Sequence, residues 1–187
     1  MTSHRPPTVP PQPALRVPAS VFEGMFVRGL KAEGRLVQEL EALGYHMKQP
    51  EVDYPIALWQ RAVAVARQVA YAKLGEEDAY RQLGRQFGRG FSETLIGRVA
   101  AVALPMIGPA RALERLPRYL AMVGRTDIEV TLSPVGDRGR RLHLTDRYNR
   151  PDLMAGALEH MLELTSIQPR ITVEERSAEG YRLLIRW

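Results

Sequence analysis

Apolar residues recur at intervals of three and four over much of the first two thirds of the chain. This spacing predicts helices over residues 33–43, 55–74 and 76–91, because such positions share one face of a helix. Gly44 and Gly75 follow the first two predicted helices, where a helix-ending glycine belongs. The N-terminal part of the domain is therefore expected to be mainly helical.

Two other segments are almost uninterrupted in their apolar character. Val21–Gly29 is rich in residues that favour strands, so we predict a short strand there. Residues 93–107 are apolar on most sides of a helix, which predicts a buried helix ending at Gly108. Pro109 then opens a further helix with a kink at Pro117.

The helix over 76–91 carries two unusual series. Gly84 and Gly88 lie four residues apart, and glycine costs a helix about 1 kcal/mol relative to alanine. We therefore expect a neighbouring backbone to approach closely there. Arg81, Arg85 and Arg89 share a different face. They could bind phosphates, although such a series is more typical of a solvated helix face.

The apolar period changes to two after residue 127. The alternation predicts hairpins over residues 128–144 and 171–187, separated by a helix over 152–165. The fold class expected is α+β, an N-terminal helical half packed on a C-terminal antiparallel sheet built as β-β-α-β-β. The single domain would cover residues 19–187, with 19–126 mainly helical and 127–187 forming hairpin, helix and hairpin.

The N-terminal segment has a different composition. Residues 1–18 hold six of the fourteen prolines, and proline lacks the N–H donor that helices and sheets require. We expect a disordered proline-rich tail, although such a segment could also dock in the groove of a partner.

Composition excludes several classes of function. The chain of 187 residues contains no cysteine, which excludes disulfides, thiol nucleophiles and iron–sulfur clusters. The net charge of +5 is spread along the chain, so we do not expect nucleic-acid binding. The longest uncharged apolar run spans about nine residues, whereas a membrane helix needs roughly twenty. We expect no membrane span and a cytoplasmic protein.

Groups suited to catalysis or metal binding are few. None of the four histidines, His4, His46, His143 and His160, has a ligand partner at metal-binding spacing, so we expect no metal. Ser92 lacks the second glycine of a nucleophile elbow. The densest polar cluster, residues 145–150, precedes a predicted helix, where it could bind an anion or simply form a capping loop.

Residues 21–187 carry a resemblance to a known family. Its marks are Phe22, Val27-Arg28-Gly29-Leu30, the run from Ala79 to Arg85, Gly90-Phe91, Thr94, Gly97-Arg98, the run from Gly108 to Leu113, Leu116-Pro117, Gly156, Tyr181 and Arg186-Trp187. On these residues the chain resembles an uncharacterised family of paralogous proteins found almost only in myxobacteria, the domain of unknown function 2378. The family has no assigned activity, so the resemblance implies no reaction.

The order of elements is also similar to that of bacterial haem-based gas sensors and related small-ligand-binding regulatory domains. This layout implies a cleft between the helical half and the sheet. The haem sensors need a histidine on the kinked helix, and the segment Ala112–Val123 has none. They also need tyrosine, serine and arginine at alternate positions, where this chain has Asp146, Tyr148 and Arg150. The resemblance therefore implies a pocket without haem, and we expect no cofactor.

These observations favour a non-catalytic regulatory or sensory domain. It would bind a small apolar or anionic ligand, or a protein partner, between the helical half and the sheet. Apolar positions at helical spacing usually form a plain core. The candidate ligand-binding residues are Trp59, Phe87, Phe91, Met106, Tyr119 and Arg150.

Two alternatives remain open. The first is a homo-oligomeric interaction module, for example a homodimer, in which the apolar helix over 93–107 would be buried in the interface. The second is an enzyme, which would need residues distant in the sequence to meet, such as Asp146 and His160. An interaction module should show a mass that depends on concentration.

Overall fold

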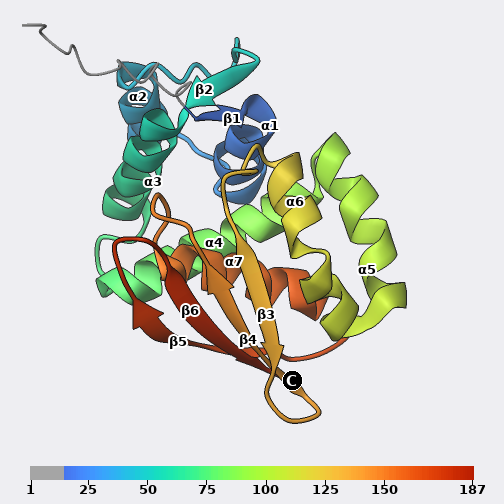
Figure 1. Cartoon of the computed structure of the whole chain (residues 1–187). Helices are drawn as coiled ribbons and strands as arrows, with labels where there is room; N and C mark the ends of the chain where they lie inside the picture. Colours follow the sequence, from blue (N-terminus) through green and yellow to red (C-terminus); the bar gives the residue numbers. More distant parts are fainter. Residues whose placement is uncertain (1–14) are drawn as a thin grey trace, which may run out of the picture.

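The computed structural model describes residues 15–187, and its N-terminal half is a group of helices (Figure 1). A two-stranded ribbon, β1 (Arg16–Pro18) with β2 (Asp53–Pro55), lies beside them. The helices are α1 (Ala19–Phe22), the π-helix η1 (Glu23–Gly29), α2 (Arg35–Ala42), α3 (Ile56–Ala70) and α4 (Glu76–Ser92). The three helices predicted between residues 33 and 92 are confirmed.

The strand predicted over Val21–Gly29 is wrong, because this segment forms α1 and η1. The buried side chains are Val21, Phe22, Met25 and Phe26, a spacing that puts them on one side of a helix. Strand-forming residues at helical spacing are ambiguous, and here the tertiary packing decides the outcome.

The expectation that residues 1–18 form no regular structure is wrong for the last three of these residues. Residues 1–14 lie outside the described part of the chain, but Arg16–Pro18 pairs antiparallel with Asp53–Pro55. Prolines are tolerated in a two-stranded ribbon because one edge of each strand needs no partner. The Arg16 side chain also donates from Nε to Asp53 Oδ1 over 2.6 Å.

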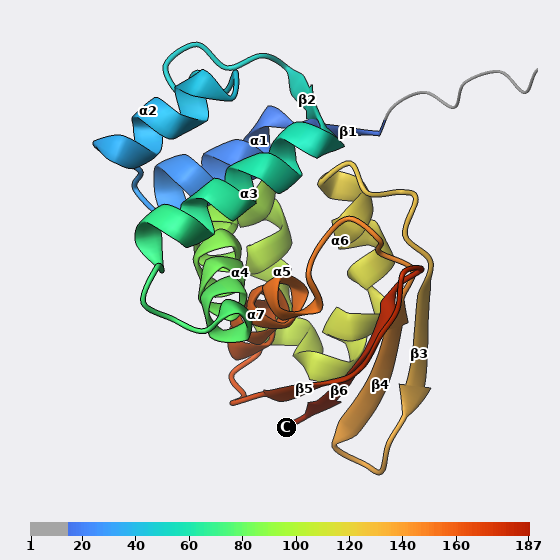
Figure 2. The same ribbon diagram turned by 90° about the vertical axis from the view of Figure 1, so that its left-hand side faces the viewer.

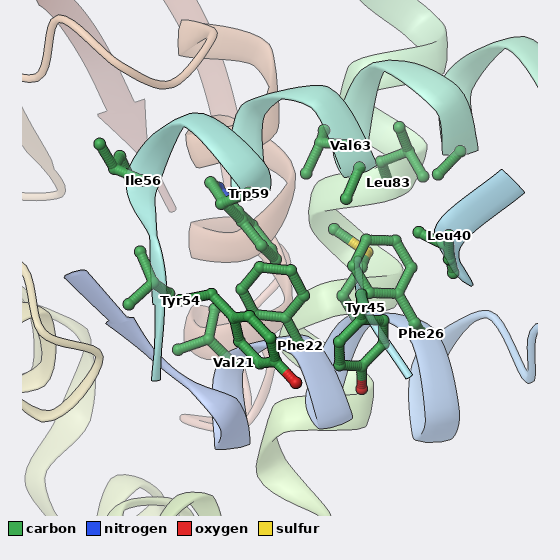
Figure 3. Packing of buried hydrophobic residues seen from close by; sticks show 14 of the residues in the cluster. Val21, Phe22, Phe26, Leu40, Tyr45, Tyr54, Ile56, Trp59, Val63 and Leu83 are labelled. Atoms are coloured by element: carbon green, nitrogen blue, oxygen red, sulfur yellow. The ribbon is translucent and has the colours of Figure 1, made fainter. Parts of the chain in front are cut away.

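Aromatic rings fill the core of the helical half (Figure 3). Phe22 lies at its centre, with its ring centroid 4.7 to 5.9 Å from those of Phe26, Tyr45, Tyr54 and Trp59. Tilted and edge-on rings at this separation attract each other beyond the burial of their surface. We call these five residues the aromatic cluster.

The second half of the chain joins three helices to an antiparallel sheet with order β3-β4-β6-β5. One face of the sheet is covered by helices, as Figure 2 shows. The elements are α5 (Leu95–Glu114), α6 (Leu116–Met122), β3 (Val130–Pro134), β4 (Gly139–Leu144), α7 (Pro151–Glu163), β5 (Arg170–Arg176) and β6 (Tyr181–Arg186). Both predicted hairpins, the intervening helix and the α+β fold class are confirmed.

Helices α4 and α7 connect the two halves. A Cβ on Gly84 would overlap the carbonyl oxygen of Leu153, and a Cβ on Gly156 would overlap that of Arg81. Each glycine therefore lets the opposite backbone approach. Gly88 similarly faces His160 Cβ. The close backbone approach expected at these glycines is therefore confirmed at Gly84, whereas the atoms nearest to Gly88 belong to the His160 side chain.

Two of the three arginines in the α4 series, Arg81 and Arg85, pair with carboxylates. Arg81 Nη1 lies 2.6 Å from Glu159 Oε1, and Arg85 bonds both Glu159 and Glu163 on α7. Arg81 also donates to the backbone oxygen of Ile171 on β5. Neither phosphate binding nor a purely solvated face is needed to explain Arg81 and Arg85, because they hold α4 to α7 and the sheet.

The burial predicted for residues 93–107 is wrong. The helix exposes an apolar outer face consisting of Leu95 (81% exposed), Val99 (72%), Val102 (72%) and Met106 (79%). Its rotation is set by Gly97, whose missing Cβ allows the helix to lie against the carbonyl oxygen of Phe91. Gly97, Ala100 and Ala101 consequently face inward together with Leu104, while four large apolar side chains of the same helix face outward.

The predicted break at Gly108 is confirmed, with a φ of 71° that favours glycine. It divides α5, which is otherwise long and apolar enough to be a membrane-helix candidate, into two short pieces. The continuous part before Gly108 is too short to cross a bilayer as a straight helix. The kink predicted at Pro117 lies at Arg115, because Pro117 occupies the first turn of α6.

Candidate ligand-binding site

A cavity of about 160 Å³ lies where the helical half meets the second half. Its lining comes from α7, from the end of α4, and from α5 and α6. Residues of β1, α1 and α3 complete it. The lining joins the two hydrophobic cores of the chain, so a ligand there would contact both.

The walls of the cavity are almost entirely apolar. Small residues on α5 (Gly97, Ala100 and Ala101) create space, because they face larger side chains across the cavity. Methionines 122, 154 and 161 contribute flexible side chains that can adapt to different shapes. The polar side chains among the lining residues are Ser92, Tyr119, Arg125, Asn149 and His160.

The structure brings four of the six candidate residues to this cavity. Trp59, Phe87, Phe91 and Tyr119 line it, and the ring centroids of Trp59 and Phe87 are 5.8 Å apart. Whether they contact a ligand stays a prediction. Helical spacing identified them because they lie on the inner faces of α3, α4 and α6.

The other two candidates, Met106 and Arg150, do not line this cavity. Met106 belongs to the apolar outer face of α5, because Gly97 fixes the rotation of that helix. Arg150 is half-exposed, pairs with Glu76 and stacks over the ring of Tyr80 at 5.2 Å. It borders a separate polar hollow with Trp59 and Tyr80.

Sequence reasoning missed Arg125, the charged residue of the cavity wall. Its side chain is 5% exposed, and it donates from Nε and Nη2 to both carboxylate oxygens of Asp127. Nη2 also lies 2.7 Å from Oδ1 of Asp146, a fully buried carboxylate. The hydrogen bonds to Asp127 and Asp146 outweigh the opposing effect of burial and raise the pKa of Arg125. Arg125 therefore remains charged.

Asp146 organises the polar loop that precedes α7. Its carboxylate accepts hydrogen bonds from the backbone N–H groups of Tyr148 and Asn149 and from the side chains of Asn149 and Tyr181. Asn149 in turn accepts from Trp59 Nε1 at 2.9 Å. This network ties the loop to α3 and to the sheet, which favours a structural role for residues 145–150.

His160 and Ser92 meet at the α4–α7 side of the cavity. The His160 Nε2 and Ser92 Oγ atoms are 3.5 Å apart, while the Ser92 hydroxyl donates to the carbonyl oxygen of Arg89. Burial lowers the pKa of His160, with Arg89 and Arg85 adding to the effect and Glu163 opposing it. His160 and Asp146, the example given above of distant residues that could meet in an enzyme, do not pair in residues 15–187. Asp146 instead forms hydrogen bonds with Arg125, Asn149 and Tyr181.

The model of the family "Protein of unknown function (DUF2378)" matches residues 15–187. The chain belongs to this family. No curated protein sequence matches it. Membership of DUF2378 assigns the chain to a family but gives it no function, so a function has to be inferred from the site.

Solved structures of H-NOX domains share the fold. An oxygen-binding H-NOX domain related to soluble guanylate cyclases superposes with a TM-score of 0.65 at 16% identity, covering 90% of each chain. A mutant H-NOX protein from K. algicida in its Fe(II) unliganded form gives 0.65 at 10% identity, covering 90% of this chain and 95% of the other. A mutant H-NOX from T. tengcongensis gives 0.63 at 15% identity, covering 90% and 93%. These likenesses establish an H-NOX-like fold.

The cavity does not fit the haem that such a fold implies. Its volume of about 160 Å³ is close to that of a cavity that holds benzene, roughly 150 Å³, whereas a porphyrin contains four pyrrole rings. The kinked segment Ala112–Val123 offers no histidine. The histidine that does line the cavity, His160, lies with its Cβ against Gly88 and its Nε2 near Ser92. The residues that line the cavity therefore favour a ligand smaller than haem.

Proposed function

We propose that this DUF2378 protein is a non-catalytic sensory or regulatory domain that binds a small, mainly apolar ligand without haem. The apolar cavity at the junction of the two cores carries the proposal. Such pockets, with a few polar groups at defined positions, are typical of small-molecule sites. The H-NOX-like fold supports it by analogy, because the solved relatives include an oxygen-binding domain.

The size of the cavity limits the ligand. A space of about 160 Å³ suits a molecule with roughly the volume of benzene or a short branched chain. A larger ligand would require α5 to move. This helix is the wall that can move most easily, because it leaves most of its large side chains outside the core. Movement of α5 on binding would change the exposed surface and give the domain an output.

The polar side chains near the cavity support the non-catalytic part of this proposal. Within residues 15–187 no three carboxylate or imidazole groups converge on a metal site. Ser92 and His160 meet, but the Ser92 hydroxyl already donates to a backbone carbonyl. We place the protein in the cytoplasm and in a myxobacterial source as expectations that accompany the proposal.

The first test is mass spectrometry of freshly purified protein under native and then denaturing conditions. A mass excess that disappears on denaturation identifies a carried ligand and its class, and a haem-sized excess would overturn the haem-free site. Titration with benzene, followed by NMR, then measures binding to the empty protein. Saturable binding supports the proposal, and no binding of benzene together with no carried ligand would contradict it.

Two variants that replace an alanine of α5 by leucine test whether the ligand binds in this cavity. Ala101→Leu places a larger side chain in the cavity and should abolish benzene binding. Ala103→Leu makes the same change on the same helix at a residue that does not line the cavity, so binding should persist. Equal binding by the two variants would show that benzene binds elsewhere.

A second candidate function is a homodimer formed through the apolar outer face of α5. Leu95, Val99, Val102 and Met106 follow the 4-3-4 spacing of a coiled-coil seam. The same face can pair with itself about a two-fold axis, as isologous interfaces do. Sedimentation should show a mass of two chains at high concentration, and Val99→Glu should restore the monomer. A monomer at every concentration would exclude this candidate.

A further inference from the structure

The outer face of the four-stranded sheet presents two exposed arginines. Within residues 15–187, helices cover the inner face of this sheet and leave the outer face open (Figure 2). Ile171 on β5 and Ile185 on β6 are opposite each other, and both are buried, so they mark the inner face. Side chains alternate between the two faces of a strand. The next cross-strand pair, Arg170 and Arg186, therefore points outward, where both residues are exposed.

Two other arginines of the outer face are neutralised by glutamates. Arg141 on β4 donates from Nε to Glu174 Oε2 over 2.7 Å, and Arg182 Nη1 on β6 lies 2.8 Å from Glu175 Oε2. The consecutive residues Glu174 and Glu175 both reach this face because the pairing of β5 with β6 is irregular there. The hydrogen bonds from Arg141 lower the pKa of Glu174, so its carboxylate is ionised. In this part of the face each positive charge has a negative partner.

Arg170 and Arg186, the arginine pair, have no such compensation. They lie directly opposite each other, and neither forms an ion pair within residues 15–187. Side chains in such positions have Cβ atoms about 5 Å apart, and like charges there destabilise a sheet. The position opposite Arg186 on β4 is Gly139, which supplies no side chain. An acidic group placed between the two guanidinium groups would relieve their repulsion.

The small size of this charged site restricts its partner. Surfaces that bind anionic membranes typically gather about four to eight basic residues, and nucleic-acid binding likewise draws on many phosphate contacts. The outer face offers two uncompensated arginines, and it also carries Glu174 and Glu175. A short acidic segment of a protein matches a site of this size, because carboxylates accept paired hydrogen bonds from guanidinium groups.

We propose that the outer face of the sheet binds a protein partner through an acidic segment, with aspartate or glutamate carboxylates lying between Arg170 and Arg186. Neither arginine is among the residues that line the cavity, so the proposal does not depend on ligand binding there. It gives the domain a surface through which it contacts another protein, on the side of the sheet away from the helices.

The first experiment titrates an acetylated hexaglutamate peptide into the full chain and follows the backbone amides by NMR. Hexaglutamate should shift the amides of β5 and β6 around the arginine pair, and its affinity should fall as salt increases. Hexaglutamine, the neutral counterpart, should cause no shifts. No binding of hexaglutamate at millimolar concentration would overturn the proposal, as would shifts confined to other parts of the chain.

A double variant isolates the arginine pair. Arg170→Gln with Arg186→Gln should weaken hexaglutamate binding about fivefold, as expected for the loss of two exposed ion pairs. The matched control, Arg61→Gln with Arg111→Gln, removes the same charge at exposed positions on α3 and α5 and should bind the peptide like the wild type. An equal loss of affinity in both variants would mean that only the net charge matters and would overturn the site.

A charge reversal tests the arginine pair without any partner. Arg170→Glu replaces two opposed like charges by opposite charges, so the urea midpoint of unfolding should rise while hexaglutamate binding is lost. Arg182→Glu serves as the contrast, because it breaks the contact with Glu175 and should lower the midpoint. A lower midpoint for Arg170→Glu would contradict the uncompensated pair on which the proposal stands.

Two further probes distinguish other acidic partners. These are a short oligothymidylate and vesicles that contain phosphatidylserine. If either one bound more tightly than hexaglutamate and lost that binding in the double variant, the arginine pair would belong to a nucleic-acid or membrane surface, and the proposal would fail. Preference for the peptide, lost in the double variant and kept in its control, supports an acidic protein segment.

Discussion

The two sides of α4 differ in how completely their space is filled. On the side that faces the N-terminal helices, the rings of the aromatic cluster pack against one another, with centroids from 4.7 to 6.1 Å apart (Figure 3). On the other side, alanines, two glycines and methionines contribute to the lining of a cavity, and α5 holds four large apolar side chains outward. The comparison separates a filled scaffold from an adaptable region, and ligand binding is expected in the second.

Helix α4 belongs to both regions. Gly90 lies against the backbone of η1, and Gly84 lies against the backbone of α7. Two interfaces without side chains fix α4 firmly, so a change on the cavity side should reach the aromatic cluster mainly through Trp59, the member of the cluster that lines the cavity.

The largest effect is expected from truncating the centre of the aromatic cluster. Phe22→Ala removes a fully buried ring with four aromatic partners and should reduce the free energy of unfolding by about 3–5 kcal/mol. Phe91→Ala, on the cavity wall, should cost about 1–2 kcal/mol, because a partly exposed ring removes less apolar surface from water. Urea unfolding measures both. Equal losses would show that the two regions are packed alike.

The next effect tests the contact between α4 and α7. Gly84→Ala places a Cβ where the carbonyl oxygen of Leu153 lies, so the helices must separate, at a cost of about 1–3 kcal/mol. Gly75→Ala is the matched control, since it has open space and lies just before the same helix. If Gly84→Ala were no more destabilising than Gly75→Ala, the two helices would not be held as closely as their glycines indicate.

Much of this fold was predictable from local patterns. The 3.6-residue period located α2, α3, α4 and α7, and the change to alternation located the sheet, because each element carries the periodicity of its buried face. The pattern failed at Val21–Gly29 and over 93–107 for one physical reason. Both are apolar on several sides, so only tertiary contacts such as that of Gly97 with Phe91 decide their form and rotation.

The site was less predictable than the fold. Helical spacing could find Trp59, Phe87, Phe91 and Tyr119, because inward-facing aromatic residues follow the period of their helices. Arg125 carries no such signal. Its position in the site depends on Asp146, 21 residues away, and on a cavity lined by seven helices and strands. The one local feature of the sequence that points to an ion pair here is Asp127, two residues after Arg125.

A smaller effect concerns pH and the cavity wall. Burial lowers the pKa of His160 below its ordinary value of 6.5. As pH falls, the imidazole is therefore protonated in the unfolded chain at a higher pH than in the folded chain. Stability should therefore decrease as pH falls through about 6.5 and level off below the folded pKa. His160→Asn should reduce the decrease in urea melts between pH 8 and 5. His143→Asn, on the other face of the sheet from the helices, should retain the wild-type profile, and a similar flattening there would refute the assignment.

The smallest effect is expected on the outer face of α5, where Val102 is 72% exposed. Val102→Ala should change the stability of a monomer by less than about 0.5 kcal/mol, as exposed positions do, and Val52→Ala serves as a control on an exposed loop. If the chain pairs through α5, the loss caused by Val102→Ala should instead grow with protein concentration, because association stabilises only the folded state. Urea melts at two concentrations a hundredfold apart therefore distinguish the roles of the two faces of one helix. An effect confined to high concentration assigns the outer face to a partner copy. An effect that is small at both concentrations means that α5 acts only through its inner face, on the cavity.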